Sequence, residues 1–180
     1  MGQLIDLFER EPKSNIQPLI EKEDKAMEAQ AFLEQIIAPT LKATGLWSLS
    51  AERLLLGTAL AESGLRTVTQ YGGGPALSFM QIEPATYNDV VKYINRRSKK
   101  KATLLGALYM EVFPAHECLA WNMRLSVLIA RMLYLRKVQP LPVADDITGM
   151  AHYWKAHYNT EHGKGTVEHF IEQWRIYGIA

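Results

Sequence analysis

This sequence has a single cysteine, no long hydrophobic run and almost no excess of one charge, and each of these absences excludes some classes of protein. The single cysteine, Cys118, permits no disulfide bond within the chain, so folding does not depend on an oxidising compartment. No run of about 18 apolar residues is present, so we expect no membrane-spanning helix. The net charge is only +1, and we expect no nucleic-acid partner, because dedicated nucleic-acid binders carry a strong positive excess.

Sequence motifs for metals, phosphates and serine nucleophiles are missing as well. His152 and His157 are five residues apart, whereas two histidines that bind a metal from one helix face are typically four apart. The Gly-Lys-Ser/Thr ending of a phosphate-binding loop does not occur. Ser63 and Ser78 lack the Gly-x-Ser-x-Gly context of a hydrolase nucleophile. We therefore expect neither a metal ion nor a cofactor.

The composition that remains is that of an ordinary globular protein. The 180 residues are 48% hydrophobic and 22% charged, with no internal repeat. Apolar residues recur at intervals of three and four along most of the chain, which predicts a mainly helical fold. We expect residues 1–48 to form an N-terminal helical segment packed on the core, and residues 49–180 to form one compact domain. A docking arm for a particle or partner is the alternative role of the N-terminal segment.

The apolar periodicity also places the individual helices. Pro39 should kink or end the first helix, Ser50 should cap the second, Gly64 should stop it, and Pro84 should lie in the first turn of the third. The fourth is the longest and has the apolar coverage of a central core helix. The predicted helices cover residues 22–37, 54–63, 84–95, 115–137, 143–157 and 166–177.

Glu62 is the most informative single residue of the chain. If the segment Leu54–Ser63 is helical, its apolar side chains cover almost the whole circumference, and such a helix belongs inside a protein. Glu62 follows Ala59 by three residues and Leu55 by seven, so it lies on this apolar surface. A carboxylate at the end of a buried helix is costly unless it is paired or holds a proton. Glu62 is therefore our best candidate for a working acid.

Two further sequence blocks follow this acid. After Glu62-Ser63 come the glycine-rich Gly72-Gly73-Gly74-Pro75-Ala76 and then Met80-Gln81-Ile82-Glu83-Pro84-Ala85-Thr86. Together the blocks resemble the catalytic core of the soluble lytic transglycosylases and goose-type lysozymes, members of the lysozyme-like superfamily. The resemblance implies a mainly α, lysozyme-like catalytic domain over residues 49–180, with a short β-like flap or loop beside the active site. The middle departs from the family pattern, since Ser78 stands where a glycine is expected, and this bears on the geometry of the turn.

A third block, Tyr158-Asn159, resembles the Tyr-Asn pair at the far wall of the sugar cleft in this family. There the tyrosine orients the catalytic acid or the sugar, and an amide can bond an N-acetyl group. The family often continues with Ala-Gly, whereas this chain continues with Thr160-Glu161-His162-Gly163. Core packing together with Tyr153 and Trp154 is the alternative interpretation.

The resemblance implies a glycosidase that cleaves the MurNAc–GlcNAc β-1,4 bond in the glycan strands of peptidoglycan. Most glycosidases use two carboxyl groups, but a one-acid site suffices where the N-acetyl group of the substrate stabilises the cation. Glu62 would act as acid and then as base, and attack by the muramic acid 6-hydroxyl would give a 1,6-anhydro product. Ser63 would steady Glu62, and Met80 and Gln81 would line the sugar subsites. Glu83 is the candidate for a second acid, although an acid at a helix start also complements the helix dipole.

Three alternatives stay open on the sequence alone. Water could attack through the same site, which would make the protein a hydrolytic lysozyme, or the substrate could be chitin. A non-enzymatic phage-particle or structural protein could also keep this fold. The serine at position 78 and the altered sequence after Tyr158-Asn159 favour that last alternative, whereas the intact Glu62 and the Met80–Thr86 block oppose it.

Two features bear on location and partners. Residues 1–12 lack the basic segment and apolar run of a secretory signal peptide, so we expect cytoplasmic synthesis. An enzyme acting on the wall would then need release at lysis or packaging into a phage particle, whose proteins would be its partners. Arg96–Lys101 holds five basic residues in six, which fits a solvated helix junction. Weak, salt-sensitive attraction to anionic wall polymers is its functional alternative.

Overall fold

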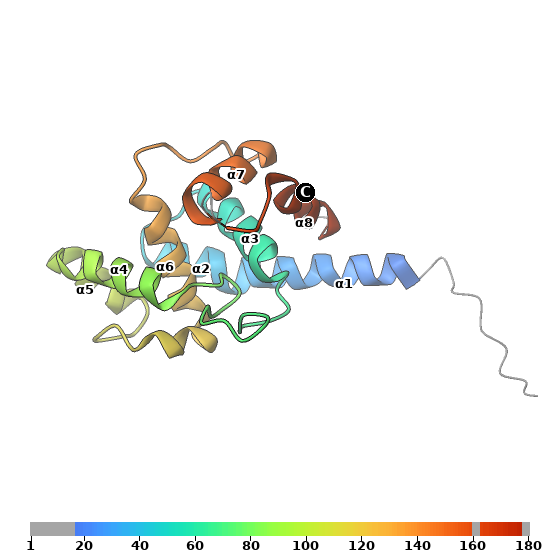
Figure 1. Cartoon of the computed structure of the whole chain (residues 1–180). Helices are drawn as coiled ribbons and strands as arrows, with labels where there is room; N and C mark the ends of the chain where they lie inside the picture. Colours follow the sequence, from blue (N-terminus) through green and yellow to red (C-terminus); the bar gives the residue numbers. More distant parts are fainter. Residues whose placement is uncertain (1–16, 160–162, 178–180) are drawn as a thin grey trace, which may run out of the picture.

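The chain is mainly helical in the part that the computed structural model describes, residues 17–159 and 163–177, and no strand occurs among these residues (Figure 1). No helix of this part is long and apolar enough to cross a membrane. The α-helices are α1 (Gln17–Phe32), α2 (Ala38–Ala43), α3 (Leu49–Ser63), α4 (Pro84–Asn95), α5 (Ser98–Ala107), α6 (Met123–Leu135), α7 (Ile147–Trp154) and α8 (Val167–Ile176). Two π-helical turns, η1 (Leu33–Ile37) and η3 (Lys155–Asn159), and one 3-10 turn, η2 (His116–Ala120), complete the order.

Helix α3 is the central element of the fold. Every residue from Leu54 to Leu60 is buried, as the apolar circumference predicts. The helix packs against α6, α7 and α8, and Figure 1 shows it enclosed by them. Gly64 ends α3 with φ 57°, a left-handed conformation that glycine adopts without strain, so the predicted helix stop is confirmed.

The start of α3 differs from the prediction. Ser48, not Ser50, is the N-cap: its Oγ accepts a hydrogen bond from the backbone N–H of Ala51 at 3.1 Å. Either serine can cap a helix, and sequence alone does not say which one has the extended backbone that a cap requires. The helix therefore begins at Leu49.

The first helix changes character before Pro39. Proline has no N–H to give to an α-helical hydrogen bond, and the backbone adapts by a π-helical turn. In this turn the N–H of Ala38 donates to the carbonyl of Leu33, five residues earlier. The helix then continues as α2 and ends at Ala43, before Gly45 with φ 67°.

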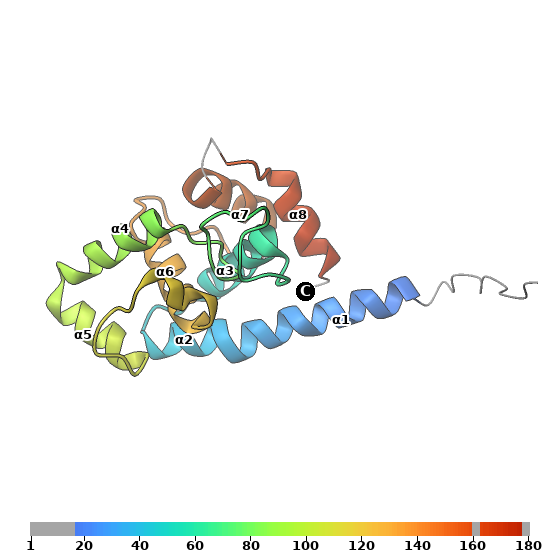
Figure 2. The same ribbon diagram turned by 60° about the horizontal axis from the view of Figure 1, so that its bottom comes forward.

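Helix α1 lies along the body and then extends beyond it (Figure 2). Ala29 and Phe32, in its second half, belong to the same buried core as Tyr177 near the other end of the chain. Met27, by contrast, is 68% exposed. Residues 1–16 lie outside the described part, and the division of the chain at residue 48 stays a prediction.

The single long helix predicted over residues 115–137 is wrong. The apolar pattern runs on without a gap, but the backbone forms the 3-10 turn η2 and restarts as α6 at Met123. Asn122 causes the restart, because its Oδ1 accepts a hydrogen bond from the N–H of Leu125 at 2.9 Å. Residues 125–132 are all buried, so α6 itself is a core helix as expected.

Capping residues also set the other boundaries. The helix predicted over residues 143–157 begins later, because Oδ1 of Asp146 accepts a hydrogen bond from the N–H of Gly149 at 2.7 Å. Helix α4 starts at Pro84 as predicted. Thr166 caps α8 by accepting a hydrogen bond from the N–H of His169 at 3.1 Å.

The segment between α3 and α4 is a loop. The β-like flap expected there forms no strand among the described residues. Two isolated antiparallel bridges, Thr69 with Leu77 and Leu77 with Ile82, fold the loop back on itself. The loop passes beside the end of α3 (Figure 1).

Gly57 provides a test of the α3–α8 packing. A Cβ at this position would lie 2.2 Å from Cζ of Phe170, so the ring rests directly on the glycine backbone. We expect Gly57→Ala to destabilise the protein by about 2 kcal/mol or more, because the buried ring would have to move. Urea unfolding measures this. Gly106→Ala is the matched control, since nothing lies within 4 Å of a Cβ there and the change should stabilise α5 slightly.

Candidate active site

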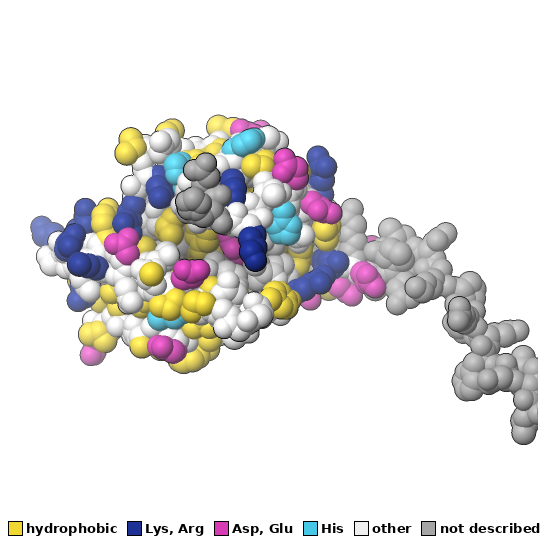
Figure 3. All heavy atoms as spheres, in the orientation of Figure 1, with side chains coloured by type: hydrophobic (Ala, Val, Ile, Leu, Met, Phe, Trp, Pro, Cys, Tyr) yellow, Lys and Arg dark blue, Asp and Glu magenta, His cyan; other side chains and the backbone are white. Residues whose placement is uncertain are grey.

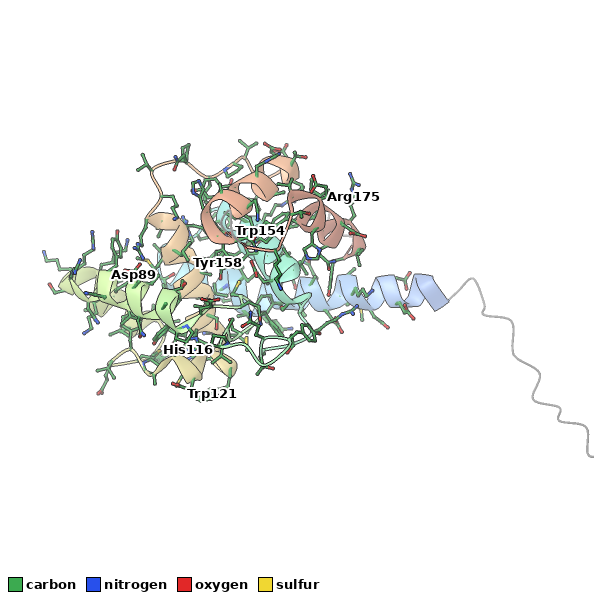
Figure 4. The ribbon with its side chains drawn as sticks, in the orientation of Figure 1. Asp89, His116, Trp121, Trp154, Tyr158 and Arg175 are labelled. Carbon is green, nitrogen blue, oxygen red and sulfur yellow. The ribbon has the colours of Figure 1, made fainter. Side chains whose placement is uncertain are left out.

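A cleft of about 850 Å³ opens beside the C-terminal end of α3. Glu62, the last residue but one of α3, lies half-buried in its wall. The other walls come from the loop before α4, from η3 and from the residues that lead into α8. Figure 4 places Trp154 and Tyr158 in the middle of the molecule, near the end of α3. Segments far apart in sequence therefore meet at the acid.

The electrostatics of the site centre on the Glu62 carboxyl group. Burial raises the pKa of Glu62 from its ordinary value of 4.5 to about 7. Three groups act in the opposite direction: the indole of Trp154, the side chain of Asn159 and the charge of Lys155. The indole Nε1 donates to Oε1 of Glu62 at 3.0 Å. Because burial outweighs the three, Glu62 holds a proton close to neutral pH, as a general acid must.

Lys155 fixes the orientation of the Asn159 amide. Its Nζ donates to Oδ1 of Asn159 at 2.9 Å and to the carbonyl of Gly163 at 2.8 Å. An ammonium group only donates, so the amide oxygen must face Lys155, and the amide NH₂ is left to donate toward Glu62. Lys155 therefore favours the ionised form of Glu62 in two ways, directly through its charge and indirectly through the orientation of Asn159.

Two glycines let the segment after Asn159 approach Asn159 and Trp154 closely. A Cβ on Gly163 would lie 2.1 Å from the carbonyl oxygen of Asn159. A Cβ on Gly165 would lie 2.5 Å from Cη2 of Trp154. Larger residues at either position would push the segment away from the acid, which explains the glycine-rich composition after Asn159.

Tyr158 borders the cleft but does not hold the acid. Its hydroxyl donates to the carbonyl of Met80 at 2.7 Å, which ties η3 to the loop before α4. Behind it, the ring of buried Tyr134 lies 5.4 Å away between ring centroids. The hydroxyl of Tyr134 in turn shares a 2.8 Å hydrogen bond with Thr58 of α3. The hydrogen bond to Glu62 comes from Trp154, and a role of Tyr158 in orienting the acid or the sugar stays a prediction.

Ser63 and Met80 lie next to the site in a different manner from that expected. The Ser63 hydroxyl donates to the carbonyls of Ala59 and Phe79, at 3.1 and 3.0 Å, and it does not hydrogen-bond Glu62. It thus joins the end of α3 to the loop. The Met80 side chain is fully buried in the core and is not among the residues that border the cleft. Its backbone carbonyl, not its thioether, takes part in the wall through Tyr158.

Gln81 lines the cleft, and a strained turn places it there. Both Gln81 and Ser78 have positive φ, 46° and 69°. The glycine of the family pattern falls on Ser78, where that conformation would cost glycine nothing. Here hydrogen bonds hold the turn: Ser78 Oγ accepts from the N–H of Met80 at 3.1 Å, and Gln81 Nε2 donates to the Ser78 carbonyl at 2.9 Å. The turn therefore forms without a glycine at position 78.

Among the described residues, Glu83 is the other carboxyl group that borders the cleft. It is exposed and occupies the N-cap position of α4 without a side-chain capping bond. Its roles as a second acid and as a partner for the helix dipole both stay predictions.

Sequence reasoning missed Trp154, Lys155 and His169. The aromatic pattern indicates core packing for Trp154, and its ring centroid does lie 5.5 Å from that of Phe170. Its indole N–H, however, also donates a hydrogen bond to Glu62. His169 lies in the cleft wall, with Nε2 2.9 Å from the carbonyl of Ala61. A carbonyl only accepts, so Nε2 carries the proton. The sequence signal that could have identified Trp154 is its position four residues before Tyr158, which places both side chains near the same face of a helix.

Replacing Trp154 by phenylalanine should raise the pKa of Glu62 above about 7, because the hydrogen bond that favours the ionised carboxylate is lost. An NMR titration of the Glu62 carboxyl carbon measures the shift. Trp47→Phe is the matched control, since the indole of Trp47 donates to Glu52 on the exposed surface. An unchanged or lowered pKa in Trp154→Phe would show that the indole does not act on the acid.

The basic cluster Arg96–Lys101 lies at the junction of α4 and α5, and Figure 3 shows Lys and Arg side chains gathered at that end of the molecule. The Arg97 guanidinium stacks on the ring of Tyr93, 3.7 Å from its centroid. Arg136 also faces this ring and forms an ion pair with Asp89 at 2.7 Å. The cluster is a helix junction, and its attraction to anionic polymers stays a prediction.

Comparison with known proteins returns no family: no protein-family model, no curated protein and no solved structure matches the chain significantly. Among the described residues, no group of three or more His, Cys, Asp or Glu side chains could hold a metal ion. The function must therefore be argued from the site.

Proposed function

We propose that the protein is a lysozyme-like glycosidase that cleaves the MurNAc–GlcNAc β-1,4 bond of peptidoglycan with Glu62 as its acid and base. The observation that carries the proposal is the state of Glu62, a carboxyl group with a pKa of about 7 at the end of a buried helix, in the wall of a large cleft. The Glu62-Ser63 and Met80–Thr86 blocks, which border this cleft or support its walls, support the choice of a wall glycan as substrate.

The cleft wall offers groups suited to sugars. Tyr71 is 74% exposed and lines the cleft, and an aromatic face of this kind stacks on sugar rings. Gln81, Thr86 and Asn159 present amide and hydroxyl groups to the same cleft. Such groups bond sugar hydroxyls and N-acetyl groups.

The reaction we propose is a lytic transglycosylation. Protonated Glu62 gives its proton to the glycosidic oxygen as the bond from that oxygen to C1 of the muramic acid breaks. The acetamido group of the same sugar stabilises the positive charge at C1. The Glu62 carboxylate then takes the proton of the muramic acid 6-hydroxyl, whose oxygen bonds to C1. The product is a 1,6-anhydro sugar, and Glu62 regains its proton.

Hydrolysis through the same acid is the second candidate, and Glu83 is the observation in its favour. This carboxyl group borders the same cleft, where it could hold a water molecule for attack at C1. The product would then carry a hydrated reducing end. Glu83→Gln should remove hydrated products and spare anhydro products, which gives this alternative its own test.

Mass spectrometry of peptidoglycan digests distinguishes transglycosylation from hydrolysis by the mass of the products. Fragments lighter by one water than hydrolysed muropeptides are expected from the wild type. Hydrated fragments instead would make the protein a hydrolytic lysozyme. If purified peptidoglycan and chitin both yield no fragments, the proposal fails, and a non-enzymatic particle or structural role would take its place.

A further inference from the structure

A second hollow, of about 290 Å³, adjoins the cleft. The two share Ala61, Glu62, Tyr71 and His169 in their walls, so the Glu62 carboxyl stands at their junction. A glycan that lies in the cleft with its scissile bond at Glu62 therefore has this hollow within reach on the other side of the acid. The hollow is closed by α8 and by α1, which contributes Lys25.

Most of the titratable Lys, Arg, His and Glu side chains that line this hollow are basic. Lys25, Arg66 and His169 border it, and among the described residues Glu62 is the only acid in its wall. Glu28, on the same helix as Lys25, interacts with Tyr177 but is exposed and does not line the hollow. Figure 3 shows Lys and Arg side chains where the body meets α1. The hollow therefore places two permanent cations, Lys25 and Arg66, beside Glu62.

The two permanent cations of the hollow are not neutralised by acids. No carboxylate of the described residues lies within ion-pair distance of Lys25 or Arg66. Arg66 is exposed, and its positive charge opposes the rise in the pKa of the Tyr177 hydroxyl, so its guanidinium lies near that group. That hydroxyl in turn donates to the carbonyl of Gly64, which ends α3. A guanidinium carries five N–H donors, so Arg66 has donors available for an anion.

We infer that this hollow binds a carboxylate on the muramic acid substituent of the substrate, so that the site selects peptidoglycan over neutral glycans such as chitin. The inference rests on the proposed function for the identity of the glycan. Muramic acid carries its lactyl group, and the stem peptide attached to it, next to the bond that is cut. Chitin carries no negative charge, and it would leave Lys25 and Arg66 without an anionic partner.

The inference gives α1 a role in recognition. Lys25 belongs to the N-terminal segment, outside residues 49–180, and the second half of α1 is anchored in the core through Ala29 and Phe32. The helix therefore holds Lys25 in a fixed place beside the hollow. Substrate selection would then depend on a helix that the sequence assigns to packing or docking.

A binding experiment tests the inference without relying on catalysis. The full chain with Glu62→Gln is titrated with a tetrasaccharide of alternating GlcNAc and MurNAc in three forms: with stem peptides, with the lactyl carboxylate only, and with that carboxylate amidated. The same titrations are made with Lys25→Gln and Arg66→Gln added together. Lys99→Gln with Lys100→Gln, which removes two charges on α5, is the matched control.

We expect the carboxylate forms to bind about tenfold more tightly than the amidated form at low salt, and the preference to vanish in the Lys25/Arg66 variant but not in the control. A preference already complete with the lactyl form identifies that carboxylate as the anion, and one that needs the peptide identifies the peptide carboxylates. Equal binding of all forms, or no binding, overturns the inference. The proposed function fails separately, if wild-type protein does not cleave glycan strands.

Discussion

Replacing Glu62 by glutamine should lower the rate of glycan cleavage by about 10³-fold, because a positioned general acid contributes on this scale. Glutamine keeps the size of the side chain and can still accept the hydrogen bond from Trp154, but it has no proton to give to the glycosidic oxygen. Release of soluble fragments from purified peptidoglycan, followed over time, measures the rate. The loss should be in kcat, since the variant can still bind the strand.

A second Glu→Gln substitution, at an exposed position away from the cleft, serves as the control for the removal of one carboxyl group. Glu172 is exposed on α8 and does not border the cleft. Glu172→Gln should retain wild-type activity within a few-fold. Activity of Glu62→Gln close to that of Glu172→Gln would mean that Glu62 is not the acid.

The same Glu62→Gln substitution should stabilise the folded protein by up to about 3 kcal/mol at about pH 8, and by almost nothing at about pH 4. The folded state holds the Glu62 proton up to about pH 7, whereas the unfolded chain releases it near the ordinary value of 4.5. Between these two values the unfolded state binds fewer protons, so wild-type stability falls as the pH rises through this window. Glutamine does not ionise, and the variant escapes this loss.

Urea unfolding of both proteins at the two pH values measures the difference. Comparison of wild type with variant cancels the pH dependence of every other group that the substitution leaves unchanged. A difference in unfolding free energy that is the same at both pH values would show that burial does not raise the Glu62 pKa. A stabilised but inactive variant would show that the acid is kept at a cost to stability, as is usual for working groups.

The helix that carries the acid could be predicted, because its physical signals are local. An apolar circumference predicts a buried helix, and Gly64 marks its end through the left-handed conformation that only glycine adopts freely. The same periodicity gave a wrong prediction before α6, where it indicated one helix over residues 115–137. Apolar residues continue across Asn122, and the break depends on whether this side chain caps a helix start, which the apolar pattern does not contain.

The partners of the acid could not be predicted in the same way. Periodicity places Trp154 on a buried face, but the direction of its indole N–H depends on how α7 crosses α3. Motif resemblance identified Met80 as a neighbour of the cleft, yet its side chain faces the core and only its carbonyl takes part. Resemblance predicts which segments meet, whereas the orientation of each side chain depends on tertiary packing.

The most direct test of this account is the pH profile of fragment release from purified peptidoglycan by the wild-type protein, between about pH 4 and about pH 9. Activity should be present below neutral pH and should fall as the pH rises through about 7, where Glu62 loses the proton that it must donate. Release of no fragments at any pH, or a rate that does not fall through this range, would contradict the role given to Glu62.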